Sequence, residues 1–211
     1  MGERARWGVM TALAFIVVGY AVGLVAVPDL RPSFLRARIA EAPLAVFGHL
    51  VASAIALAIG PLQLSSRLRT RRLHLHRWMG RFYIMSVVVG GGSAIVLAPM
   101  SMGGLPAHVG FGLLGVLWVV TALVAYQRIK VYDIADHRRW MIRSYSLALA
   151  AVTFRIYLAI GIGMMRLPMD QVYPTITWLC WVPNLIVAEW LFLRKVPVSA
   201  QVPAPSDIFA A

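Results

Sequence analysis

One stretch of the chain decides its fold class: residues 76–100, HRWMGRFYIMSVVVGGGSAIVLAPM. Between Met79 and Ala98 the only charged residue is Arg81. About 20 consecutive apolar residues is the length that an α-helix needs to cross the hydrocarbon core of a bilayer. Backbone N–H and C=O groups in lipid must bond to one another, so such a segment is predicted to be helical.

The composition of the whole chain extends this prediction. Of 211 residues, 60% are hydrophobic and 13% are charged, whereas a soluble domain is about half apolar and about a quarter charged. The net charge of +12 comes from arginines grouped between apolar runs, which is typical of membrane proteins and argues against nucleic-acid binding. Cys180 is the only cysteine, which excludes a disulfide framework and a cysteine metal cage.

Six segments have the length and composition of membrane spans. They are residues 8–27, 44–63, 79–98, 107–126, 141–164 and 173–193. The first is longer than the apolar region of a signal peptide, so we expect an uncleaved helix. The sequence therefore predicts an all-α polytopic protein in one domain, residues 1–195, with a four-helix core made by spans two to five. Pro183 is expected to break or kink the last span.

The distribution of Lys and Arg predicts the orientation. With the N-terminus inside, fifteen basic residues fall in inner segments and four in outer ones, Arg31, Arg36, Arg38 and Arg166. The inner set comprises Arg4, Arg6, Arg67, Arg69, Arg71, Arg72, Arg77, Arg81, Arg128, Lys130, Arg138, Arg139, Arg143, Arg194 and Lys195. We expect a bacterial inner-membrane protein with both termini in the cytoplasm, a disordered cytoplasmic tail at 196–211, and inner loops that bind anionic lipids.

Four histidines lie near the ends of these spans and alternate between the two sides. His49 and His108 are predicted to share the outer face, and His76 and His137 the inner face. Below each histidine, the helical face is lined wholly or partly by small residues. Two facing imidazoles with small neighbours are typical of a bis-histidine metal or heme site. The pattern predicts one or two b-type hemes.

Simpler interpretations of the same residues remain open. Transmembrane helices also pack closely through Gly, Ala and Ser, and histidines near helix ends can contact lipid headgroups. His108 follows Pro106 directly and so lies in the first turn of its helix, where it is the weakest of the four ligands. His74 is an alternative to His76 as the inner partner of His137.

Charged residues near these positions have expected roles. Arg77, Arg81 and Arg155 are candidates to pair with heme propionates, and Arg155 could instead contact an acidic lipid. Arg143 and Glu189 lie at similar depth on the fifth and sixth spans, so we expect an ion pair between them.

Three segments resemble an uncharacterised bacterial membrane family, domain of unknown function 2306. They are Gly60–Tyr83, with GPLQL and HRWMGRFY, His137–Arg155, with HRRWMIRSY and AAVTFR, and Trp178–Trp190, with WLCWVPNL. The resemblance covers roughly residues 45–193 and implies a polytopic membrane protein, without an activity; His108 lies outside its motifs. The order of the histidines is also similar to that in the ascorbate-dependent transmembrane b-type cytochromes, where alternate helices supply four histidines to two hemes.

These observations support three functional hypotheses. The first is transmembrane electron transfer through heme b, with a quinone or a partner subunit as the redox partner. The second is a non-redox accessory or lipid-binding subunit of a larger complex, and the third is a transporter. No hydrolase or nucleotide-binding motif is present, so nothing assigns an enzymatic reaction. A homo-oligomer and a hetero-oligomer are both compatible with the sequence.

Overall fold

The computed structural model describes residues 2–193, which are almost wholly helical and contain no strand. The long elements are α1 (Glu3–Ala26), α3 (Pro43–Leu64), α5 (Leu73–Leu97), α6 (Gly104–Lys130) and α7 (Ile134–Ala148). The shorter helices are α2 (Ser33–Glu41), α4 (Ser66–Arg71), α8 (Ala150–Leu158), α9 (Met169–Leu179) and α10 (Val182–Ala188). The prediction of an all-α polytopic membrane protein is confirmed.

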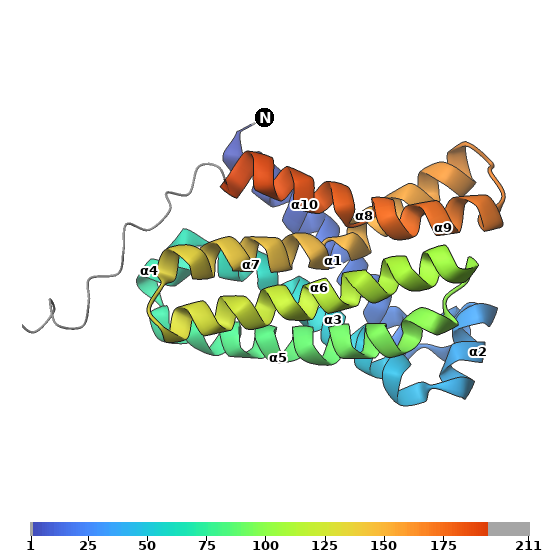
Figure 1. Cartoon of the computed structure of the whole chain (residues 1–211), viewed down its shortest axis with the longest axis horizontal. Helices are drawn as coiled ribbons and strands as arrows, with labels where there is room; N and C mark the ends of the chain where they lie inside the picture. The colour runs from blue at the N-terminus through green and yellow to red at the C-terminus, as the bar shows by residue number, and fades with distance from the viewer. Residues whose placement is uncertain (1, 194–211) are drawn as a thin grey trace, which may run out of the picture.

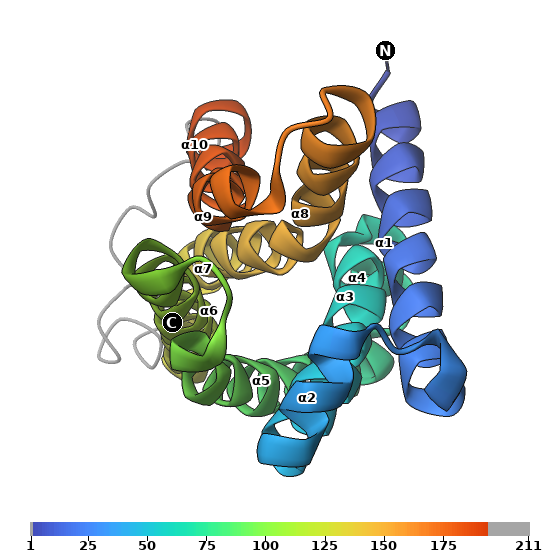
Figure 2. The same cartoon turned by 90° about the vertical axis from the view of Figure 1, so that its right-hand side faces the viewer.

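Helices α3, α5, α6 and α7 form the core of the bundle, as the sequence predicts. Helix α5 packs between α3 and α6, and α7 packs on α6. Viewed along the bundle, α5 and α7 lie on opposite sides of its axis, as do α3 and α6 (Figure 2). Helix α1 packs outside α3 and against α8. We call the end with α4 and the α6–α7 turn the basic end (left in Figure 1), and the other the opposite end.

Five segments of the structure are long and apolar enough to cross a membrane. They are Ala5–Ala26, Pro43–Leu64, Leu73–Met100, Gly104–Lys130 and Ile134–Met164. The sixth predicted span, 173–193, is not one helix: α9 and α10 are separated at Cys180–Trp181. Pro183 lacks the N–H that would continue the helical bonding, which explains the break. Arg194, Lys195 and the tail at 196–211 lie outside the described residues.

A second interruption, which the sequence did not indicate, divides the fifth span at Leu149, between α7 and α8. The two interruptions face each other and are joined by side chains. Asn184 Nδ2 lies 3.2 Å from the Ser146 carbonyl oxygen and 2.9 Å from that of Cys180. Thr153 Oγ1 donates to the same Cys180 oxygen at 2.5 Å. Carbonyls released from the helical ladder therefore obtain partners, as they must in lipid.

Two core helices start earlier than predicted. Helix α5 begins at Leu73 instead of Met79, and α7 begins at Ile134 instead of Met141. The side chain of Asp133 accepts a bond from the Asp136 N–H at 3.0 Å, which caps the start of α7. Both inner histidines therefore lie inside the first turn of a helix, where backbone geometry fixes their directions.

Gly60 of α3 packs directly against the ring of Tyr145 on α7. A Cβ at Gly60 would lie 1.9 Å from Cε2 of Tyr145, which is buried and donates to the Leu57 carbonyl at 3.3 Å. Gly60→Ala should therefore destabilise the bundle by about 1–3 kcal/mol, as overpacked cores do. Gly92→Ala is the matched control, because a Cβ there meets nothing within 4 Å.

Thermal unfolding of the two variants in the same detergent checks this expectation. A clear fall in Tm for Gly60→Ala, with Gly92→Ala at or above the parent, is the expected result. Equal Tm values for both variants would show that Tyr145 moves without cost.

Candidate functional site

His76 and His137 face each other across the basic end of the bundle. Helices α5 and α7 both begin at this end, and the Tyr83 hydroxyl bonds the Ser144 hydroxyl across the core at 2.9 Å. His76 precedes Tyr83 by seven residues, and His137 precedes Ser144 by the same number. Seven residues are about two helical turns, so His76 lies on the same face of α5 as Tyr83, and His137 lies on the same face of α7 as Ser144. Because Tyr83 and Ser144 bond each other, the two histidines lie at similar depths in the bundle. Their imidazoles are close enough to interact electrostatically.

The hydrogen bonds of this pair leave ring nitrogens available. His137 Nδ1 donates to the Ala125 carbonyl of α6 at 2.8 Å, which orients the ring and leaves Nε2 as the atom that could bind a ligand. A backbone bond of this kind commonly orients a metal-binding histidine. His76 Nδ1 is buried without a hydrogen-bond partner in the described part of the chain. Buried polar atoms normally have a partner, so this nitrogen is available to a ligand, as is the buried Nε1 of Trp181.

Basic side chains surround His76 on the basic end. Arg69 and Arg77 are both close enough to interact with its imidazole. Arg81 instead lies over the ring of Trp78, with its Cζ 5.1 Å from the ring centroid. Arg69 was missed as a site residue, because it lies in α4, which has the composition of a loop in the sequence.

His74 occupies a different face of α5 from His76. Its Nε2 accepts a bond from Trp78 Nε1 at 3.1 Å, and its side chain is exposed. Of the two candidates for the partner of His137, His76 is the one that the structure brings to it.

His49 lies nearer the opposite end, between α3 and α5. Its Nδ1 donates to the Gly90 carbonyl at 2.9 Å. Arg155 is near enough to interact with it, donates to the Ala151 carbonyl at 2.7 Å, and lies over the ring of Tyr20 at 5.0 Å. No carboxylate among residues 2–193 forms an ion pair with Arg155.

The structure does not bring His108 to His49. His108 Nε2 bonds the Ser101 carbonyl at 3.0 Å, in the turn that leads into α6. His49 instead bonds the Gly90 carbonyl, and the neighbouring Gly91 packs against Gly115 of α6. Gly115 follows His108 by seven residues of α6, about 10 Å along the helix. The two imidazoles therefore lie at different depths.

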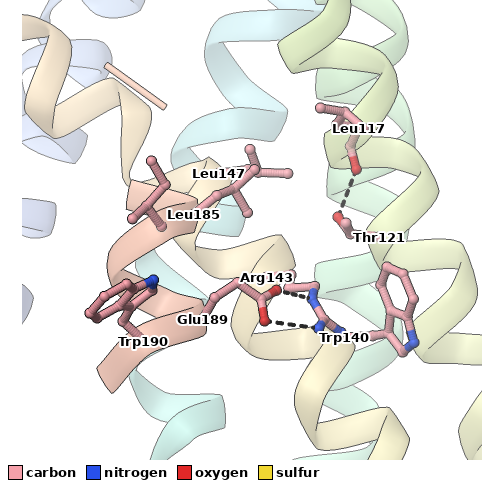
Figure 3. A pocket seen from close by; sticks show the side chains of 9 residues that line it. Leu117, Thr121, Trp140, Arg143, Leu147, Leu185, Glu189 and Trp190 are labelled. Atoms are coloured by element: carbon pink, nitrogen blue, oxygen red, sulfur yellow. Dashed lines mark hydrogen bonds and ion pairs between the residues drawn. The ribbon is translucent and has the colours of Figure 1, made fainter. Parts of the chain in front are cut away.

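Arg143 and Glu189 form a bidentate ion pair, with Nε to Oε1 at 2.6 Å and Nη2 to Oε2 at 3.2 Å. The pair joins α7 to the π-helical segment Glu189–Leu193 that follows α10. It borders a groove of about 430 Å³ between α6, α7 and α10 (Figure 3). The Arg143 guanidinium also lies 4.6 Å from the centre of the Trp140 ring.

The ligand types at the basic end match one kind of cofactor. Residues 2–193 contain no cluster of three or more His, Cys, Asp or Glu side chains that could enclose a metal ion. A structural zinc site needs four such ligands, whereas a heme iron needs only two axial imidazoles from facing helices. Two imidazoles are the histidine ligands that a heme takes, and a bare metal ion at this position would need further ligands.

The helical bundle and its apolar surface define a polytopic membrane protein. Residues 46–192 match the family described as "Predicted membrane protein (DUF2306)". The match covers more than half of the chain, so the protein belongs to this family, as the sequence motifs indicate. No curated protein and no solved structure matches the chain. The likeness to b-type cytochromes stays a prediction.

Proposed function

We propose that this protein binds one b-type heme at its basic end through His76 and His137, and that it transfers electrons within the membrane. The observation that carries the proposal is the geometry of this pair. The two imidazoles are near enough to interact electrostatically; one is oriented by the Ala125 carbonyl, and the other has a buried Nδ1 without a partner. A heme held by His76 and His137 would supply one-electron transfer.

The surrounding residues support a negatively charged, flat ligand. Helices α5 and α7 carry the two histidines at the basic end, above the Tyr83–Ser144 bond, so a group held by both would lie at that end of the bundle. Arg69 and Arg77 are placed to pair with carboxylates at the edge of such a group. The position of Arg81 over Trp78 makes it a weaker candidate for that role.

One site is proposed instead of two because of the depth of the outer histidines. His49 packs about two turns, roughly 10 Å, along α6 from His108, so the two imidazoles would not hold the same group. Arg155, beside His49, is then free to bind an acidic lipid instead of a propionate. By the positive-inside rule the basic end faces the bacterial cytoplasm, where basic loops would contact anionic lipids. A quinone or a redox subunit would exchange electrons there.

A dithionite-reduced minus air-oxidised visible spectrum of the full-length protein in detergent tests this proposal. We expect a Soret band and an α band typical of bis-imidazole heme b, with one heme per chain by pyridine hemochrome. Two hemes per chain would restore the outer pair. A colourless protein from cells supplied with heme would overturn the proposal in favour of an accessory subunit.

The two interrupted helices are a feature that transporters share, but the polar groups at the interruptions are not available to a substrate. The interruptions lie in consecutive segments, α7–α8 and α9–α10, and not in two repeats related by symmetry. The polar groups at the interruptions bond one another through Asn184 and Thr153. This arrangement is that of a structural joint and not of a substrate site.

A further inference from the structure

The groove beside the Arg143–Glu189 ion pair has the size of a site for a small amphipathic ligand. Its volume of about 430 Å³ lies within the range of roughly 300–1,000 Å³ that is usual for ligand sites. Helices α6, α7 and α10 form its walls, and its sides are mostly apolar. It opens toward the outside of the bundle, so a ligand would reach it from the bilayer.

The ion pair gives this groove a neutral polar end that can both donate and accept. Arg143 binds Glu189 through Nε and Nη2, which leaves the two N–H groups of Nη1 and a second one on Nη2 as donors. The Glu189 side chain is 45% exposed, so its carboxylate retains acceptor capacity. Because the two charges cancel, the groove favours a neutral head over a phosphate. A ligand head group that carries a carbonyl in its oxidised form and a hydroxyl in its reduced form could bind here in both forms.

Aromatic and aliphatic side chains define the remainder of the groove. Trp140 and Trp190 lie on either side of the ion pair (Figure 3). Leu117, Leu147 and Leu185 lie together on one side of the ion pair and form an apolar wall. Since seven-residue steps along α7 lead from the basic end toward the bundle centre, Leu147 lies deeper than Trp140. A flat ring would thus lie against the ion pair, with an apolar chain running inward along the leucines.

We propose that this groove binds a lipid-soluble quinone and its quinol. The carbonyl oxygens of the quinone would accept hydrogen bonds from Arg143, and the hydroxyls of the quinol would donate to Glu189. The prenyl-type chain would lie along the leucines. The assignment goes beyond heme binding and uses none of the histidines. Arg143 follows His137 by six residues of α7, about 9 Å along the helix. A quinone in the groove would therefore lie near the proposed heme and could be its redox partner.

Photoaffinity labelling of the full chain in nanodiscs tests this site. The probe is an azido-benzoquinone with a decyl chain, and labelled residues are mapped by mass spectrometry. We expect label on α7 and α10 residues of the groove, competed by unlabelled decyl quinone. Leu185→Trp would fill the groove without touching the ion pair, and Glu189→Gln would remove the acceptor charge. Both should reduce the label at least tenfold.

Leu179→Trp is the matched control. Leu179 lines a separate groove of about 220 Å³, together with Tyr157 and Gln171, that has no ion pair. Labelling at the Arg143 groove should be unchanged in this variant. Each variant is used only where size-exclusion profiles and circular dichroism match those of the parent.

Several results would overturn the assignment. One is full labelling in Leu185→Trp, and another is labelling spread evenly over the lipid-facing surface. A third is equal competition by phosphatidylglycerol of matched chain length, which would assign the groove to bulk lipid. The test is independent of the heme: site-specific labelling of a colourless protein would support the quinone site while the heme proposal fails. A heme-containing protein that is not labelled in the groove would support the heme proposal while the quinone assignment fails.

Discussion

Replacement of His137 by alanine is expected to remove the heme absorbance of the purified protein, and His76→Ala is expected to do the same. His76 and His137 would hold the heme together, so either change would remove one of its two protein ligands. We expect the heme content per chain, measured by pyridine hemochrome, to fall more than tenfold in either variant. No other single side-chain change in the bundle is expected to have an effect of this size on the absorbance.

The matched controls are the other histidines. His108→Ala and His74→Ala should retain the absorbance, because His108 bonds the Ser101 carbonyl and His74 bonds Trp78 on the exposed face. Loss of absorbance in His108→Ala with retention in His137→Ala would contradict the assigned pair.

A rescue experiment separates ligation from folding. In His137→Gly, the deleted side chain leaves a space that free imidazole can enter from solvent at the basic end. Absorbance restored by added imidazole, and not by a matched concentration of a non-ligating salt, would show that His137 acts as a ligand. An unrescued variant with an unchanged Tm would argue against that role.

The membrane spans could be predicted because lipid imposes a simple rule on length and polarity. The segments 44–63 and 107–126 differ from α3 and α6 only at their ends. Arg143 and Glu189 could be paired from sequence because few charged residues occur within the spans, which limits the choice of partner. The break at Leu149 has no Pro or Gly to mark it, so no local rule predicts it.

The site could be predicted only in part. The two seven-residue spacings, His76 to Tyr83 and His137 to Ser144, are present in the sequence. However, the Tyr83–Ser144 bond that sets α5 and α7 in register depends on the packing of four helices. The depth of His108 likewise depends on the turn at Gly103, whose φ of 91° places Ser101 beside α6. Periodicity along one helix carries no information about its offset from another.

Asn184 lies at the joint between the two interrupted segments and supports the second large prediction. Its Nδ2 lies 3.2 Å from the Ser146 oxygen, 3.2 Å from Thr153 Oγ1 and 2.9 Å from the Cys180 oxygen. Asn184→Leu keeps a similar volume but removes the donor from carbonyls that no water replaces in the lipid core. We expect the free energy of unfolding to fall by about 2–3 kcal/mol, the cost of unsatisfied buried acceptors. Denaturation of the detergent-solubilised protein measures this change.

Thr153→Val should show that the two side chains act as one unit. Thr153 donates to the Cys180 oxygen and accepts from Asn184, so loss of its hydroxyl removes both of these bonds from the joint. In a double-mutant cycle, the combined variant should lose less stability than the sum of the single changes, because neighbouring groups that share partners are not additive. Thr175→Val is the matched control, since the Thr175 hydroxyl is exposed and bonds only the Gln171 carbonyl of its own helix. Strict additivity, or an equal loss in Thr175→Val, would mean that the joint is held by apolar packing of α8 on α9 and not by these bonds.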